Sequence, residues 1–178
     1  MEFRSIGREQ AREVTELFSS CFTSSEGAEE GDAIASLAHE LAITIDDDSV
    51  FCFAAIESQT IVGAIFFTKL AFKSPAQVYM LSPVGVLTPQ QGQGIGTKLI
   101  EFGLCGMQAH GAQVAVTYGD PDFYSKVGFF PLPADCLQAP MQLSMPSGWL
   151  GLSLTKSPIP TLSDRPTCVG AFNDPKYW

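Results

Sequence analysis

The sequence has no apolar run that approaches the roughly 20 residues that a helix needs to cross a bilayer. Its first residues, MEFRSIGREQ, also lack the basic segment and following apolar segment that are typical of a secretory signal. Both absences favour a protein that works away from the membrane. We therefore expect it in the cytoplasm.

Cysteine and histidine are too scattered to suggest a metal site. None of the cysteines forms a CxxC pair, and neither of the two histidines lies at ligand spacing from them. We expect buried, reduced thiols rather than disulfides, and no metal cofactor. The five cysteines are Cys21, Cys52, Cys105, Cys136 and Cys168.

Basic residues are few: 10 Lys and Arg stand against 19 Asp and Glu, which gives a net charge of −9. Because neutralising phosphates requires a Lys/Arg surface, this balance argues against a nucleic-acid partner and weakly favours a basic substrate. Many of the acidic residues lie in EGAEEGD (26–32) and DDD (46–48). We expect both clusters to be solvated loops.

What is present is enough for one buried core. The chain has 178 residues, 46% of them hydrophobic, and no repeat, linker or low-complexity tract divides it. We therefore expect a single domain over residues 1–178. Its fold class is predicted as α/β (α+β), with a mixed sheet flanked by helices.

The order of the expected elements matters for the site. Alternation and β-branched residues predict strands at 1–7, 50–56, 61–70, 78–87 and 113–118, with ESQT (57–60) as a turn. Helical spacing predicts helices at 8–22, after a cap at Asp32, and at 94–110 with Gly111 as its C-terminal cap. A short helix is expected at 122–128, and weaker strand signals lie at 141–145, 150–154 and 167–172.

The stretch QQGQGIGTK, residues 90–98, places three glycines between a predicted strand and a predicted helix. At such a junction the free N–H groups of the first helical turn, helped by the helix dipole, form an anion site without any lysine. Glycine lets phosphate oxygens approach this backbone closely. An acidic protein can therefore hold a phosphorylated cofactor here.

The glycine spacing excludes two common nucleotide loops. A dinucleotide fingerprint needs G-x-G-x-x-G, whereas Gly92 and Gly94 are followed by Gly96. A P-loop ends in G-K-[ST], whereas this loop ends in Gly96-Thr97-Lys98. A glycine turn that only begins a helix is the simpler alternative.

Two motifs carry a family resemblance. Gln91-Gly92-Gln93-Gly94-Ile95-Gly96 resembles the Q/R-x-x-G-x-G/A signature of the GNAT superfamily of acetyl-CoA-dependent N-acetyltransferases. Downstream, DFYSKVGFFPL is similar to the second motif f-Y-x-x-x-G-F, with Tyr124 four residues before Gly128-Phe129. The order of elements matches over nearly the whole chain, and the combination most resembles the bacterial YhbS-like subgroup.

The resemblance implies a GNAT fold, with a mostly antiparallel, twisted sheet that splays at the cofactor site, and acetyl-CoA as cosubstrate. The loop would hold the pyrophosphate, and the backbone of the strand before it would pair with pantetheine and supply the oxyanion donor. Gly85 would leave room beside the thioester. The implied cofactor-binding residues are Val84, Gly85, Val86, Gln91, Gly92, Gln93, Gly94, Ile95, Gly96, Thr97 and Thr117.

Tyr124 is the catalytic residue that the resemblance implies. When the tetrahedral intermediate collapses, coenzyme A leaves as a thiolate, and a phenol beside its sulfur can protonate it as general acid. Phe123 has no proton to give. The alternative for Tyr124 is a half-buried aromatic residue that packs the short helix on the core.

The sequence departs from the family in two places. Eleven residues before Gln91, where histone-type members have a glutamate base, this chain has Met80, which cannot take a proton. Seven residues before Tyr124, where many members have Asn, it has Thr117, whose hydroxyl replaces only one hydrogen bond. The alternatives for the base are a water chain or one of Glu57, Asp120, His39 and Tyr79, and His110 is expected to be a helix C-terminal partner.

The resemblance leaves two functions open: an N-acetyltransferase that acts by direct attack in a ternary complex, and a non-catalytic acyl-CoA-binding or regulatory domain. The acceptor would be a small-molecule or peptide amine, such as a polyamine, an aminoglycoside, a peptide N-terminus or a lysine. Its groove is expected at residues 24–41 and 141–154, with the part from about 131 to 178 completing the sheet. Trp149 and Trp178 are candidates to line it or to pack elsewhere, and a homodimer is plausible for the family.

Overall fold

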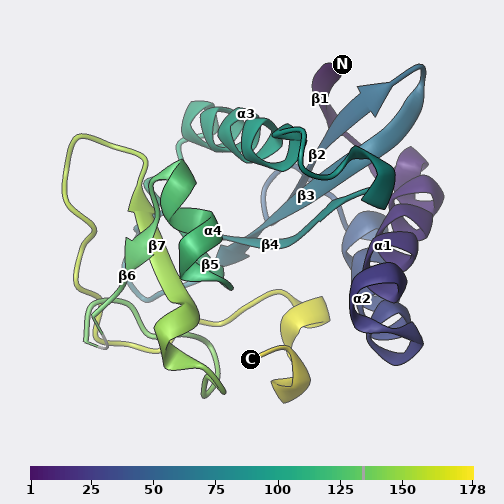
Figure 1. Ribbon diagram of the computed structural model, residues 1–178. Helices are drawn as coiled ribbons and strands as arrows, with labels where there is room; N and C mark the ends of the chain where they lie inside the picture. The colour runs from purple at the N-terminus through teal and green to yellow at the C-terminus, as the bar shows by residue number, and fades with distance from the viewer. Residues whose placement is uncertain (134) are drawn as a thin grey trace. The chain divides into compact units, whose positions relative to one another are not determined.

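The computed structural model describes residues 1–133 and 135–178 (Figure 1). The chain divides into two compact units. Unit 1 comprises Met1–Phe67 and Pro83–Gly103, and unit 2 comprises Thr68–Ser82 and Leu104–Trp178. The sequence predicted a single domain, and the division cuts through the predicted strands at 61–70 and 78–87.

The described strands form one sheet with the order β1-β2-β3-β4-β5-β7-β6. The strands are β1 Glu2–Ile6, β2 Val50–Glu57, β3 Thr60–Leu70, β4 Val78–Val86, β5 Val114–Tyr118, β6 Phe130–Pro131 and β7 Trp149–Ser153. The helices are α1 Ala11–Glu26, α2 Ala28–Ile43, α3 Ile95–Ala109 and α4 Pro121–Tyr124. β1 with β2, β5 with β7 and β6 with β7 pair antiparallel, whereas β4 with β5 pairs parallel. The predicted mixed, mostly antiparallel sheet is confirmed.

Unit 1 begins with an antiparallel pair of strands. β1 pairs with β2 from Glu2↔Ile56 to Ile6↔Cys52. Ser58 and Gln59 join β2 to β3 with φ values of 48° and 67°. A two-residue turn with positive φ at both positions matches the twist of a hairpin, so the predicted turn is confirmed.

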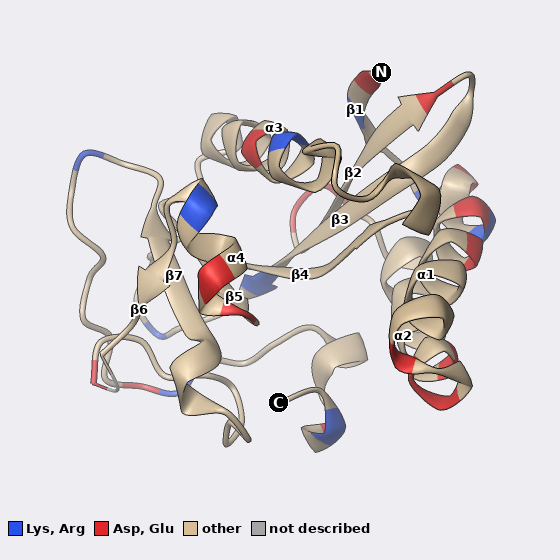
Figure 2. Ribbon diagram, in the orientation of Figure 1, with Lys and Arg blue, Asp and Glu red and all other residues tan. Residues whose placement is uncertain are grey.

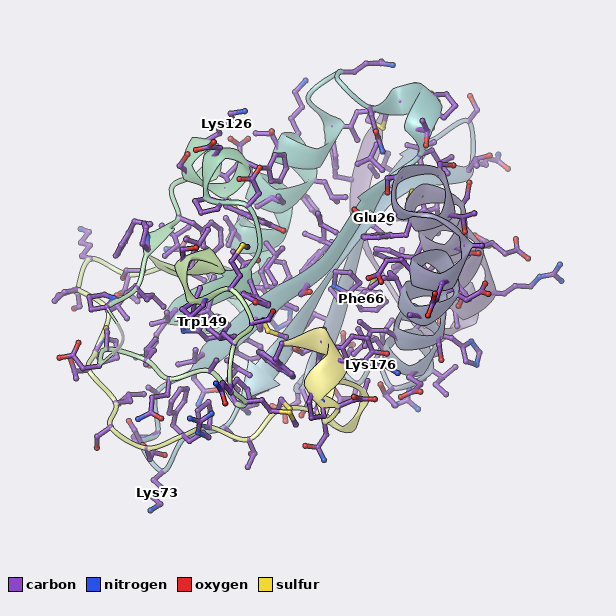
Figure 3. All side chains as sticks on the ribbon, turned by 60° about the horizontal axis from the view of Figure 1, so that its bottom comes forward. Glu26, Phe66, Lys73, Lys126, Trp149 and Lys176 are labelled. Carbon is purple, nitrogen blue, oxygen red and sulfur yellow. The ribbon has the colours of Figure 1, made fainter. Side chains whose placement is uncertain are left out.

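Helices cover both faces of the sheet in unit 1. The Phe66 ring of β3 lies 5.8 Å from the Phe18 ring of α1, and Figure 3 shows Phe66 directed toward the first two helices. On the other face, a Cβ added at Gly103 of α3 would lie 2.5 Å from Ile65 Cδ1 and 2.7 Å from Phe67 Cε2. Because neighbouring strand residues point to opposite faces, α1 and α3 pack on opposite sides of β3.

The acidic stretch at 26–32 is not the predicted loop. α1 continues to Glu26, α2 begins at Ala28, and only Gly27, with φ 98°, separates them. Asp32 therefore lies inside α2 and does not cap it. The Gly27 conformation breaks the helix in one residue, and glutamates in the first turn of α2 are favoured by the helix dipole. Figure 2 shows acidic residues gathered along these two helices.

The second acidic cluster is a loop, as predicted, but it is an ordered one. The Asp46 carboxylate accepts hydrogen bonds from the backbone N–H groups of Asp48, Ser49 and Val50, at 3.1, 2.7 and 2.9 Å. Burial raises the pKa of Asp46, but these hydrogen bonds and the charge of Arg8 outweigh it and hold the pKa below its ordinary value. Asp46 thus fixes the start of β2.

Unit 2 centres on β5. The register of β4 with β5 runs from Val78↔Val114 to Leu81↔Thr117, and β7 pairs along the other edge of β5. Trp149 and Trp178 are both buried, with their rings 6.2 Å apart. The Trp178 indole N–H donates to Phe172 O at 2.9 Å. Trp178 therefore packs within its own unit.

Two weaker strand predictions in unit 2 are wrong. Residues 141–145 form no strand, and residues 167–172 form one isolated bridge, Ala71↔Thr167, followed by a short 3-10 helix at Gly170–Phe172. Pro140, Pro146 and Pro166 flank these segments, and proline cannot donate to a strand ladder. The segment at 150–154 is confirmed as β7.

The cysteines differ in burial. Cys21 and Cys52 are buried, and burial raises the pKa of the Cys21 thiol to about 11. Cys105 is exposed and Cys136 and Cys168 are half-buried, so the expectation that all five are buried is wrong. All five are free thiols.

Among the described residues, no helix combines the length and the apolarity needed to pass through a membrane.

Candidate functional site

The glycine loop of unit 1 lies between the end of β4 and the start of α3. A short 3-10 helix at Thr88–Gln90 follows β4, and the Gln90 N–H donates to Leu87 O at 2.8 Å. The Gln91 side chain turns back, and its Nε2 donates to Val86 O at 2.9 Å. Gln91 thereby ties the loop to the strand end, a structural role that the motif alone does not reveal.

Gly92 and Gly94 are needed for their backbone conformation. Their φ values are 74° and 75°, in the region that other residues rarely adopt. A Cβ added at either position would meet nothing within 4 Å, and both residues are exposed. Packing therefore does not explain these glycines, and the surface above them is open to a ligand.

The helix α3 begins directly after Gly94 of this loop. The Lys98 N–H donates to Gly94 O at 3.1 Å, which is the first bond of the helix. The N–H groups of Ile95, Gly96 and Thr97 precede it and have no carbonyl to bind within the helix. No acidic residue lies in the first turn. The arrangement is that of a backbone anion site at the positive end of a helix dipole.

The strand before the loop extends past its pairing with β5. The register of β4 with β5 ends at Leu81, and β4 continues to Val86. Val84 and Val86 are half-buried and Gly85 is buried. A Cβ added at Gly85 would lie 3.0 Å from Phe18 Cε1, so the structure explains this glycine by the close approach of α1. Its expected place beside a thioester stays a prediction.

Tyr124 of unit 2 is held from several sides. Asp120 caps α4 by accepting from the Asp122 N–H at 2.9 Å. Gly128, with φ 93°, turns the chain so that the Phe129 N–H donates to Tyr124 O at 3.2 Å and the two rings meet edge to face at 5.7 Å. The Y-x-x-x-G-F spacing therefore places Phe129 against the Tyr124 ring.

Gly119 is a site residue that the sequence analysis did not identify. A Cβ added there would lie 2.7 Å from Tyr124 Cε2, which is too close for any other residue. The Gly119 N–H also donates to Gly148 O at 3.0 Å. Its only local signal is the run Gly119-Asp120-Pro121, which is equally typical of a simple turn.

The Tyr124 phenol is hydrogen-bonded to the side chain of Thr117. Thr117 is fully buried, and its Oγ1 donates to Leu81 O at 2.9 Å. A hydroxyl has one proton, so with that proton committed to Leu81 the Thr117 oxygen accepts from the Tyr124 O–H. The order of donation is Tyr124 to Thr117 to Leu81.

Tyr124 is kept neutral. Burial raises the pKa of Tyr124 above its ordinary value of 10, and the charge of Asp120 raises it further. The net direction is upward. At neutral pH the phenol therefore carries a proton that it can give, which is what a general acid requires.

The candidate bases lie in different surroundings. In unit 1, Glu57 is exposed and accepts from Gln90 Nε2 at 3.4 Å, while exposed His39 lies 3.5 Å from Thr15 Oγ1. In unit 2, Tyr79 is buried, and Asp120 is in the same turn as Tyr124. Of these four, only Asp120 has an electrostatic effect on Tyr124.

The two positions where the sequence departs from the family motifs are both buried in unit 2. Met80 is 1% exposed and forms part of the core of unit 2. Thr117 makes both of its hydrogen bonds inside that unit. His110 directly follows α3, where the sequence analysis expected a helix C-terminal partner, and Gly111 has the φ of a cap, 88°.

Comparison with known proteins fits these features. Residues 11–129 match the model of the acetyltransferase (GNAT) family. The protein therefore belongs to the GNAT family, as predicted.

One curated relative is the uncharacterized N-acetyltransferase YjhQ of Escherichia coli K12. It is 30% identical over 114 residues, which cover 61% of this chain and 62% of that protein. The match thus spans less than two thirds of the length of that relative.

Two solved structures show the same fold. YhbS from Escherichia coli, in complex with CoA, has a TM-score of 0.74 at 24% identity and covers 86% of this chain and 81% of its own. A GNAT family acetyltransferase from Brucella melitensis, in complex with acetyl-CoA, has a TM-score of 0.69 at 25% identity and covers 97% of each chain.

Proposed function

We propose that the protein is an acetyl-CoA-dependent N-acetyltransferase that transfers an acetyl group to a primary amine by direct attack in a ternary complex. The observation that carries this proposal is the buried, neutral phenol of Tyr124, whose hydroxyl is held by Thr117. A protein that only bound acyl-CoA would need the anion loop but not an oriented acid.

The loop of unit 1 supplies the cofactor-binding part. The N–H groups from Gly92 to Thr97 bind the pyrophosphate of acetyl-CoA, and the exposed glycines let its oxygens approach. The backbone of Val84–Val86 pairs with pantetheine and supplies an N–H to the carbonyl oxygen that becomes negatively charged. The acetyl-CoA complex of the Brucella melitensis relative supports this choice of cosubstrate.

The chemical step forms one bond and breaks one. The neutral amine attacks the acetyl carbonyl, the C–N bond forms, and the C–S bond then breaks as the sulfur leaves. Tyr124 donates its proton to that sulfur, and the amine proton leaves to water or to one of the four candidate bases. Thr117 orients the phenol through the hydrogen bond that it accepts.

Two measurements test the proposal. Calorimetry should show that acetyl-CoA binds, and a thiol-release assay should show turnover with at least one member of a panel of amines. Binding without release for every amine would instead support the non-catalytic acyl-CoA-binding domain. Absence of binding would contradict both functions.

A further inference from the structure

We propose that β1 pairs, antiparallel and about a two-fold axis, with the β1 strand of a second copy of this chain, so that the sheet continues from one protomer into the other. β1 begins the strand order, and β2 is its one neighbour among the described strands (Figure 1). Alternate residues of a strand direct their N–H and C=O groups to opposite sides, so the outer side of β1 carries backbone groups that another strand can bind. Glu2, Arg4 and Ser5 are exposed along it.

The two edges of the sheet differ in how well they are protected. At the other edge, β6 has only two residues and ends in Pro131, and a short strand with a proline is a common protection against edge pairing. β1 has five residues, and none of them is proline, glycine or lysine. The chain therefore blocks one edge and leaves the other able to pair.

The two faces of β1 are chemically different. Phe3 lies on the α3 side, where its ring is 5.9 Å from the ring of Phe102, and the Phe102 ring lies 5.9 Å from that of Phe53. Because Phe102 is 38% exposed, this aromatic row runs from the core of unit 1 out to the sheet edge. Glu2 and Arg4 point to the opposite face, where both line a pocket beside the start of α1.

The difference between the faces limits how β1 can pair with its own copy. Residues that lie opposite each other in an antiparallel pair point to the same face, so the two-fold axis passes through a residue and not between two. An axis at Glu2 or Arg4 sets that charge against its own copy, which is destabilising. An axis at Ser5 sets Glu2 beyond the end of the partner strand.

An axis at Phe3 gives both charges a partner. It sets Glu2 opposite the partner's Arg4 in two symmetric pairs, and Phe3 opposite the partner's Phe3, beside the exposed Phe102 of each protomer. Over the residues that the structure describes, neither Glu2 nor Arg4 forms a salt bridge within its own chain. The strand is therefore complementary in charge and in apolar surface to itself, which makes a second copy the occupant of this edge.

Reversal of the charges tests the pairing. Because a five-residue strand forms a small interface, sedimentation velocity should show a weak dimer of the wild type, with a Kd of about 1–100 µM. Glu2→Arg and Arg4→Glu each set like charges opposite each other and should raise this Kd at least about tenfold. Lys73→Glu, at an exposed lysine of unit 2, changes the net charge as Arg4→Glu does and should leave the Kd within about twofold.

Two restorations show whether the single variants fail through these pairs or through misfolding. The double variant Glu2→Arg/Arg4→Glu has opposite charges in both pairs again and should dimerise as the wild type does. A mixture of the two single variants should form heterodimers, because every charged pair between them joins opposite charges when the axis passes near Phe3. A wild type that stays monomeric up to about 500 µM, or single variants that dimerise equally well, would overturn the proposal. Failure of both restorations would do the same.

Discussion

The loop of unit 1 and the Tyr124 turn of unit 2 both depend on glycine, but for opposite reasons. A Cβ at Gly94 would meet nothing within 4 Å, whereas one at Gly119 would lie 2.7 Å from the Tyr124 ring. The loop presents exposed backbone to a ligand, and the turn buries a side chain against its neighbours. We therefore expect substitutions in the loop to weaken cofactor binding and substitutions at Tyr124 to slow proton donation, each without the other effect.

The largest effect is expected at Tyr124, where turnover should fall without any loss of acetyl-CoA binding. Tyr124→Phe should keep the affinity for acetyl-CoA and lower kcat by about one to three decades, because the ring remains and only the acidic proton is lost. Steady-state kinetics and calorimetry on the same preparation would show this. Unchanged turnover would remove Tyr124 from the mechanism.

The pH profile tests the same residue. Because the pKa of Tyr124 lies above 10, the phenol stays protonated from pH 7 to 9, and its ionisation should cause no loss of kcat in that window. A fall in wild-type kcat between these values that is absent in Tyr124→Phe would contradict the assignment.

The next effect concerns the loop. Gly94→Ala should raise the Kd for acetyl-CoA about tenfold, because alanine resists a φ of 75° by about 1–2 kcal/mol and its methyl group faces the ligand. Gly111→Ala is the matched control, since it has a φ of 88° and equally open space at the other end of α3. The backbone-ligand model would be wrong if both variants weakened binding equally in calorimetry.

A smaller effect tests whether Thr117 orients Tyr124. Thr117→Val keeps the shape but removes the acceptor of the phenol proton, so kcat should fall about three- to tenfold with the Kd for acetyl-CoA unchanged. Thr117→Ser keeps a hydroxyl and should restore kcat. If Thr117 contacted pantetheine instead, the valine variant would raise Kd.

The smallest effect contrasts two buried threonines. Thr68 and Thr117 are both fully buried, but Thr68 Oγ1 has no hydrogen-bond partner among the described residues. Thr68→Val should leave the free energy of unfolding unchanged or raise it by about 1 kcal/mol, whereas Thr117→Val should lower it by about 1–3 kcal/mol. Urea unfolding of both variants measures this, and equal losses would contradict the contrast.

The sequence predicted what depends on local pattern. Apolar spacing located β2, β3 and α3, and the two motifs located the loop and Tyr124, because these signals lie within short segments. The break at Gly27 was missed because clustered acids and glycines are typical of loops as well as of helix starts. The strand prediction at 141–145 was wrong because a tertiary hydrogen bond, from the Met145 N–H to the Tyr118 hydroxyl, helps to determine the path of this segment.

The site was predicted in the same uneven way. Motif spacing pointed to Tyr124 as a candidate acid, but not to the hydrogen bond that Thr117 accepts or the contact that requires Gly119. Both depend on segments that meet only after folding.

The loop from Gln91 to Thr97 contains no ionisable side chain. The loop therefore has no group whose protonation could alter phosphate binding. Its contribution to the affinity should be the same at any pH at which the protein is folded. Changes in cellular pH would then alter the rate of transfer through the acceptor amine, which must be neutral to attack, while the protein's share in holding the acyl donor stays constant.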